Sequence, residues 1–202
     1  MPDRLFRVLV SVISCVIAMQ RITPEEISAM RANGYCSSTI AKAEAWLAQC
    51  RRADVLIAKV RQAFTGVKLG EGTGLRESDG LDDYAGDAEL ERRRALDEKE
   101  DWQRIPAELL NYCNAAPCFL DAQGMVFHTP AFIVAELQGT YRQAFIGQLM
   151  SGTFTATTFP QLLSAEQRNV LMECFLFYAE LYPDSYSPSD IAEAVQRFQP
   201  HR

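Results

Sequence analysis

The chain has 202 residues, 48% of them hydrophobic and 23% charged, with a formal net charge of −6. This composition is typical of a globular protein long enough to bury a full core. The negative charge argues against a nucleic-acid-binding surface, which needs clustered Lys and Arg to neutralise phosphates, and it fits a soluble protein or one that meets a basic partner. Six widely spaced cysteines among mostly apolar residues predict reduced thiols.

An apolar N-terminal segment occupies residues 1–20. Its run from Leu5 to Met19 is shorter than the roughly 20 residues of a membrane span, so no stable span is expected. We interpret the segment as a helix or strand packed on the body of a cytoplasmic protein, or as an over-extended start with Met19 as the true first residue. The alternative is export, with the run as a signal segment or with Cys15 in a lipoprotein box.

A helical hairpin is predicted at residues 21–66. Thr23-Pro24-Glu25-Glu26 combines a capping residue, a proline and a glutamate in the order that starts a helix. That helix is expected to stop at Asn33-Gly34. A long second helix with an apolar stripe at helical spacing then runs to Phe64. A helix-turn-helix or a ubiquitin-associated-like module is the alternative, but the second helix begins with Lys42 and Glu44 and not with a basic face.

Residues 67–202 are predicted to form a helical core domain with an acidic loop and helix at 71–101. Five glycines predict a loop from Leu69 to Gly86, and helical propensity continues from Glu89 to Trp102. Short apolar runs at Cys118–Leu120 and Met125–Phe127 predict a small β-hairpin, with helix-loop-helix as the alternative. Further helices are expected from Thr129-Pro130 to Leu137, about Tyr141 to Met150, Gln167 to Leu181 and Ile191 to Phe198. The fold class is therefore mainly α, a single helical domain with at most one small β-hairpin.

The acidity of the chain is local. Between Glu71 and Asp101 twelve acidic and five basic side chains give a formal charge of −7, so the rest of the chain sums to +1. Such a segment is commonly a solvated helix face. It also suits a phosphate-mimicking surface that blocks a basic active site. Oxygen ligation of a metal by Asp79, Asp82 and Asp83 is a further reading, although the spacing does not match a calcium loop.

No motif for chemistry has its expected context. The glycines from Gly70 to Gly74 follow a long helix and include Glu71, which would repel phosphate. Cys113, Cys118 and His128 lack a fourth ligand at zinc spacing. A Cys118–His128–Asp121 set for nucleophilic catalysis is not demanded by spacing either. We therefore expect no metal and no cofactor, and favour a non-catalytic protein.

Three residues in this region have structural expectations. Trp102 should anchor the acidic helix to the core through its ring. Asp121 should cap the turn that Gly124 completes. His128 should be a partly buried histidine in a turn before Pro130.

The central stretch resembles an uncharacterised bacterial domain family of unknown function. The resemblance covers about Ala63 to Leu137 and continues more weakly through Leu162 to Tyr178. It is carried by Ala63-Phe64, Val67, Leu69-Gly70, Leu81-Asp82-Asp83-Tyr84, Asp97-Glu98, Asp101-Trp102, Ile105-Pro106, Phe119-Leu120-Asp121, Gly124, Phe127-His128 and Pro130-Ala131. His128 and Thr129-Pro130 depart mildly from the family, where a histidine or tyrosine is followed by Leu-Pro. The resemblance implies a soluble bacterial protein and transfers no catalytic residue.

The leading functional hypothesis is a non-catalytic acidic protein-interaction domain, such as a bacterial immunity protein that neutralises a toxin. Its partner would present a basic surface. The alternative is a metal-dependent enzyme or metal-binding protein. Its site would use Asp82, Asp97, Asp101, Asp121 and His128. The candidate interaction residues are Asp82, Asp83, Tyr84, Asp97, Asp101, Trp102, Asp121 and His128.

Overall fold

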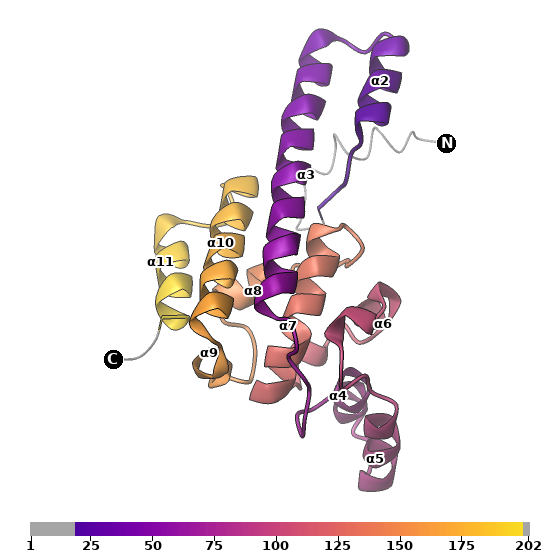
Figure 1. Cartoon of the computed structure of the whole chain (residues 1–202), viewed down its shortest axis with the longest axis vertical. Helices are drawn as coiled ribbons and strands as arrows, with labels where there is room; N and C mark the ends of the chain where they lie inside the picture. The colour runs from indigo at the N-terminus through magenta and orange to yellow at the C-terminus, as the bar shows by residue number, and fades with distance from the viewer. Residues whose placement is uncertain (1–18, 200–202) are drawn as a thin grey trace.

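The computed structural model describes residues 19–199, and within that range the fold consists of α-helices and two short 3-10 helices, without a strand (Figure 1). The mainly α, single-domain fold is therefore confirmed. The predictions for Leu5 to Met19 and for Cys15 concern a segment that, apart from Met19, lies outside the described residues. Between residues 19 and 199 no helix combines the length and apolar character that crossing a membrane requires.

The N-terminal helical hairpin is present as α2 (Pro24–Ala32) and α3 (Ser37–Ala63). Thr23 and Glu26 form the predicted capping box, because each side chain accepts a hydrogen bond from the other's backbone amide. Helix α2 and the first half of α3 extend away from the other helices (Figure 1). The second half of α3 packs on the body of the protein through α7 and α10.

Helix α7 (Ala122–Leu137) is the centre of the core. Every residue from Gly124 to Leu137 is buried, as expected for a helix that is apolar on all sides. Around it lie α3, α8 (Phe145–Ser151), α9 (Phe159–Leu162) and the 3-10 turn η1 (Trp102–Arg104). Helix α10 (Ala165–Leu181) packs against α3 and α8, and α11 (Pro188–Arg197) packs against α8 and α10.

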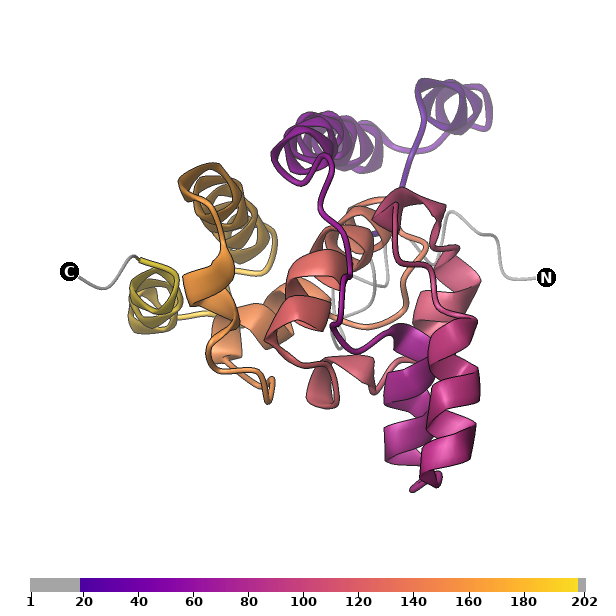
Figure 2. The ribbon, with the colours of Figure 1, turned by 60° about the horizontal axis from the view of Figure 1, so that its bottom comes forward.

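A second helical hairpin consists of α4 (Leu75–Asp82) and α5 (Asp87–Ala95) and lies at the opposite end of the molecule from α2. Figure 2 shows the two helices side by side, projecting from the core as a pair. Helix α6 (Ala107–Tyr112) and the 3-10 turn η2 (Ala116–Cys118) connect this hairpin region to α7.

The prediction of a loop throughout Leu69 to Gly86 is wrong, because α4 occupies part of it. Gly80 lies inside α4, where an added Cβ would meet the side chains of Leu90 and Arg93 on α5. Glycine at this position therefore permits close packing of two helices and does not mark a turn. The predicted helix from Glu89 to Trp102 starts at Asp87 and ends at Ala95, and Trp102 belongs to η1 instead.

The predicted β-hairpin is also wrong, and its helical alternative is correct. Cys118 ends η2, and Met125–Phe127 lies in α7. Helix α7 begins at Ala122, so Thr129-Pro130 falls in its interior and does not start it. Pro130 has no backbone N–H, so α7 loses one helical hydrogen bond there. The helix tolerates this loss because it is packed on all sides. Helix α8 and helix α11 likewise start at Phe145 and Pro188, and not at the predicted Tyr141 and Ile191.

Candidate functional site

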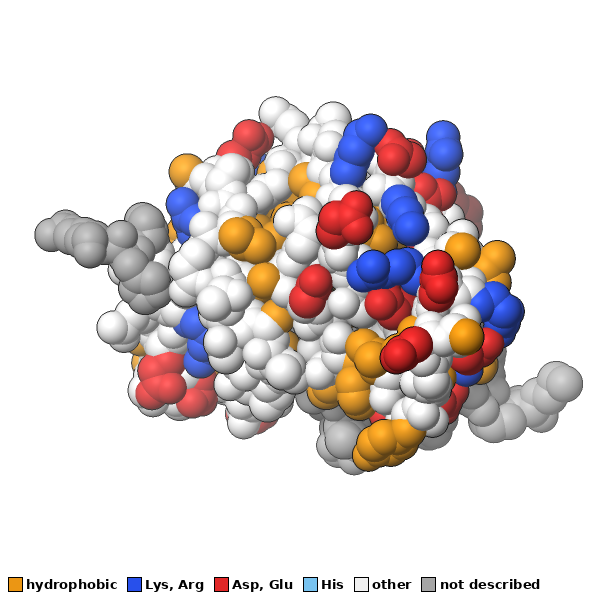
Figure 3. Space-filling view, turned by 90° about the horizontal axis from the view of Figure 1, so that it is seen from below, with side chains coloured by type: hydrophobic (Ala, Val, Ile, Leu, Met, Phe, Trp, Pro, Cys, Tyr) orange, Lys and Arg blue, Asp and Glu red, His pale blue; other side chains and the backbone are white. Residues whose placement is uncertain are grey.

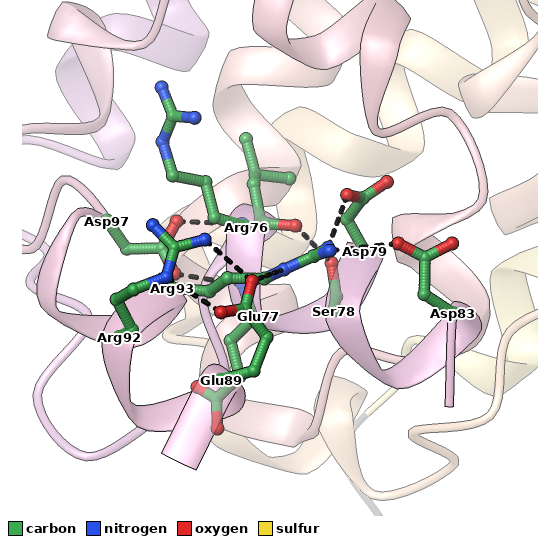
Figure 4. Close-up of polar contacts among 10 residues, drawn as sticks. Arg76, Glu77, Ser78, Asp79, Asp83, Glu89, Arg92, Arg93 and Asp97 are labelled. Carbon is green, nitrogen blue, oxygen red and sulfur yellow. Dashed lines mark hydrogen bonds and ion pairs between the residues drawn. The ribbon is translucent and has the colours of Figure 1, made fainter. Parts of the chain in front are cut away.

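The α4–α5 hairpin, which we call the acidic hairpin, carries most of the residues selected from the sequence. Helix α4 begins at Leu75, and the preceding Gly74, at the N-cap position, has no side chain to cap it. The carboxylate of Asp97 takes over this role from beyond α5. Its Oδ1 accepts a hydrogen bond from the Arg76 amide at 2.8 Å and its Oδ2 one from the Glu77 amide at 3.2 Å (Figure 4). A Cβ on Gly74 would collide with this carboxylate, so the glycine permits the close approach.

Arg93 lies at the centre of the acidic hairpin and joins its two helices. Its guanidinium contacts Asp79 at 2.7 Å, Asp83 at 3.0 Å and Glu89 at 2.9 Å (Figure 4). These contacts raise the pKa of Arg93. Hydrogen bonds from Arg92 and Arg93 lower the pKa of Glu89 to about 2. The network gives three carboxylates an arginine partner and links α4 to α5.

Arg94 on α5 likewise pairs with residues at and before the start of α4. Its Nε lies 2.9 Å from a Glu77 carboxylate oxygen, and its Nη2 donates to the carbonyl oxygen of Glu71 at 3.2 Å. On the face seen from below, acidic and basic side chains are accordingly interleaved (Figure 3). The segment with a formal charge of −7 therefore does not present a uniformly acidic surface, because several of its carboxylates have arginine partners within the hairpin.

The tip of the acidic hairpin is where its side chains are most exposed. Tyr84 is 96% exposed and has a left-handed backbone with φ of 55°, an unfavourable conformation for a residue other than glycine. Asp82, Asp83 and Asp87 lie within three residues of it in the chain and are exposed as well. The tip thus presents an aromatic ring among carboxylates.

The remaining candidates Asp101, Trp102 and Asp121 have structural roles outside the hairpin. Asp121 caps α7 by accepting from the Gly124 amide at 2.6 Å, as predicted, and also accepts from the Thr73 amide at 3.1 Å. Asp101 caps η1 by accepting from the Gln103 amide at 3.0 Å. Trp102 is 3% exposed, and its indole N–H donates to the carbonyl of Phe64 at the end of α3. Its ring is therefore in the core as predicted, but it anchors η1 and not the acidic helix, which ends at Ala95.

His128 lies in the core, buried within α7 and not partly buried in a turn as predicted. Its Nδ1 is 2.8 Å from the carbonyl oxygen of Gly124. Burial lowers the pKa of His128 to about 4, so the ring is neutral at pH 7. Asp82, Asp83 and Tyr84 therefore lie together at the exposed tip of the hairpin. His128 is a residue of the core and is not exposed with them.

The arrangement offers little to a metal ion. From residue 19 to residue 199 no group of three or more His, Cys, Asp or Glu side chains is placed to hold one. Cys113 is buried and Cys118 exposed, and the five cysteines of that range are free thiols. A cavity beside Trp102 and Ile105 has a volume of about 100 Å³, below the roughly 300–1,000 Å³ of ordinary ligand pockets.

Glu136 is a buried acidic residue that the sequence analysis does not single out. Glu136 on α7 is 1% exposed, and its Oε2 accepts a hydrogen bond from the Ile146 amide at 2.8 Å, which caps α8 inside the core. The Tyr178 hydroxyl is a second hydrogen-bond partner. Burial raises the pKa of Glu136 to about 8. The available signal was a single acid in the apolar run Phe132-Ile133-Val134-Ala135-Glu136-Leu137.

Comparison with known proteins identifies the family. Searches of the curated proteins and of the solved structures find no match. The model of a family of unknown function, DUF6714, matches residues 52–198, which include the acidic hairpin, α7 and α10. The match covers more than half of the chain, and we conclude that this protein belongs to the DUF6714 family of unknown function.

Proposed function

We propose that this protein is a non-catalytic protein-interaction domain that binds a partner through the tip of the acidic hairpin. The observation that carries the proposal is Tyr84, a tyrosine 96% exposed and held in a left-handed conformation. Tyrosine is enriched among the residues that dominate binding at protein interfaces. A strained backbone that the fold maintains at an exposed tip also favours a functional role.

Electrostatics indicates the kind of partner. Asp82, Asp83 and Asp87 flank the ring, so the partner would present basic side chains around an apolar recess. Arg93 contacts Asp83 and Asp79 and joins the two helices. This cross-link keeps the tip in one arrangement before binding, which reduces the entropy lost on association.

A bacterial immunity protein that neutralises a toxin fits this proposal. An enzyme that acts on nucleic acid has a basic active site, which an acidic projection with an aromatic end can occupy and block. The protein would then act in the cytoplasm, where such a toxin has its target.

The test is affinity capture of tagged full-length protein from the cells that encode it, after mild chemical cross-linking. The wild type should retain a specific basic protein. Tyr84→Ser combined with Asp82→Lys and Asp87→Lys should lose it. These substitutions avoid Asp97, Asp101 and Asp121, whose carboxylates cap helices and turns.

Tyr112→Ser is the matched control, because Tyr112 is also largely exposed, at 72%, but lies on α6. This control should retain the partner. The proposal fails if the wild type captures no specific protein, or if the triple variant captures it as well as the wild type does.

A further inference from the structure

A groove between α3 and α10 is a second surface with a defined chemical pattern. The two helices lie side by side (Figure 1) and run antiparallel. Ion pairs cross the groove from Arg52 to Glu180 at 2.7 Å and from Lys59 to Glu173 at 2.5 Å. On each helix the two charged positions are seven residues apart, which is two helical turns.

An apolar hollow of about 350 Å³ lies between these two ion pairs. The buried side chains of Leu56 and Phe177 line it. Val55, 58% exposed, and Leu176, 50% exposed, line it from opposite helices. A second hollow of about 370 Å³ continues the groove beyond the pair of Lys59 and Glu173.

The groove residues follow the spacing of a helix-packing stripe. Intervals of three and four residues separate successive positions on both helices, as they do where helices pack in a bundle. The stripe comprises Arg52, Val55, Lys59 and Gln62 on α3 and Glu166, Asn169, Glu173, Leu176 and Glu180 on α10. Two adjacent helices with such stripes form half of a four-helix bundle.

The charges of the groove are self-complementary. The α3 side carries bases, Arg52 and Lys59, and the α10 side carries acids, Glu173 and Glu180. A partner of one charge sign would face a like-charged row on one of the two helices. A second copy related by a two-fold axis parallel to the helices places its acidic row over the basic row of the first copy. Its basic row then lies over the acidic row of the first copy.

We propose that this groove is a dimerisation surface whose occupant is a second copy of the chain, giving a two-fold symmetric four-helix bundle of α3 and α10. A two-fold rotation leaves the position of each residue along the axis unchanged, so the register between the helices of the two copies is fixed. Val55 of one copy faces Leu176 of the second copy, and each ion pair faces its symmetry mate. The interface has a small apolar centre ringed by charges, an arrangement that shields the centre from water.

The first experiment measures self-association of the full chain by sedimentation equilibrium over a wide concentration range. The expected result is a reversible monomer–dimer equilibrium with a dissociation constant of about 1–100 μM, as suits a contact smaller than a standard interface. Leu176→Glu should weaken dimerisation at least about tenfold, because it places a buried charge at the centre of the contact.

Leu162→Glu is the matched control, since Leu162 is an equally exposed leucine at 53% on α9, outside the groove. The control should dimerise as the wild type does. A chain that stays monomeric at every concentration overturns the proposal. So does a dimer that Leu176→Glu leaves intact while circular dichroism shows both variants folded.

The second experiment tests the symmetry by disulfide cross-linking in a background with Cys15, Cys36 and Cys118 replaced by serine. Val55→Cys protein mixed with Leu176→Cys protein should form a covalent dimer under mild oxidation. Neither variant should do so alone, because like positions lie diagonally across the bundle, beyond the roughly 7 Å Cα separation that a disulfide spans. Cross-linking of either variant alone, or none in the mixture, overturns the proposed arrangement. The tip of the acidic hairpin has no part in either experiment, so the two proposals succeed or fail separately.

Discussion

The acidic hairpin and helix α7 hold their ionisable side chains in opposite ways. In the hairpin, Arg93 and its carboxylate partners are charged, remain partly exposed and pair with one another. In α7, Glu136 and His128 are buried. Burial raises the pKa of Glu136 and lowers the pKa of His128, which favours the neutral form of each side chain. Charge pairing at a surface contributes little per pair, whereas each large apolar side chain buried on α7 contributes more. The difference teaches that ion pairs hold the hairpin together as a projection, whereas α7 is held by apolar packing in the core.

The largest effect is expected from removing an aromatic side chain of α7. Phe132 is 0% exposed, and its ring stacks on Phe145 with centroids 4.6 Å apart. Phe132→Ala should lower the free energy of unfolding by about 3–5 kcal/mol, because it removes apolar burial and leaves a cavity. Urea denaturation measures the change, with Leu162→Ala as an exposed control near zero. Equal losses in the two variants would contradict the central place of α7.

Glu136 should make the protein less stable as the pH rises. Its folded pKa of about 8 lies above the ordinary 4.5. Between these values the folded state binds more protons than the unfolded state, so stability is full below pH 4.5 and is lost as the pH approaches 8. Over the whole range the loss should be about 4–5 kcal/mol. Glu136→Gln keeps an acceptor for the Ile146 amide but cannot ionise.

Urea denaturation at pH 5, 6.5 and 8 compares the two proteins. The wild type should become less stable across this series, and Glu136→Gln should be nearly level and more stable than the wild type at pH 8. Parallel profiles for the two proteins would show that folding does not raise the pKa of Glu136.

In the hairpin, the largest effect is expected at Asp97. Asp97→Ala removes the acceptor of two α4 amides and should destabilise the protein by about 1–2 kcal/mol, as the loss of a helix cap does. Asp97→Asn should lose less, because its amide oxygen can still accept. Asp82→Ala, at an exposed site on the same hairpin, should change stability by less than about 0.5 kcal/mol. The idea of a cap supplied from beyond α5 is refuted if Asp82→Ala costs as much as Asp97→Ala.

The smallest effect, and a stabilising one, is expected at the tip. Tyr84→Gly should raise the free energy of unfolding by about 0.5–1 kcal/mol, because glycine adopts the left-handed φ of 55° without strain. Tyr84→Ala should not, since alanine carries the same strain. The ring at this position makes little packing contribution, as its 96% exposure shows. A loss of stability in the glycine variant would mean that the tyrosine supports the fold.

Local signals predicted the helical hairpin well and the acidic hairpin poorly. The capping residues Thr23 and Glu26 are three residues apart, so their hydrogen bonds depend on nearby sequence alone. The cap of α4 comes from Asp97, about twenty residues further along the chain, and no local pattern contains it. The glycines between Leu69 and Gly86 predict turns, whereas Gly74 and Gly80 allow close contacts with other segments of the chain.

The sequence by itself determined that the protein is helical, where α2 and α3 lie, that Trp102 is an anchor and that Asp121 is a cap. These features follow from residue spacings within a few helical turns. Only the tertiary structure decided which acids are exposed at the tip, that Arg93 pairs with three carboxylates of the hairpin, and that Glu136 and His128 are buried. The physical reason is that the environment of a charged side chain depends on segments far apart in sequence, which packing alone brings into contact.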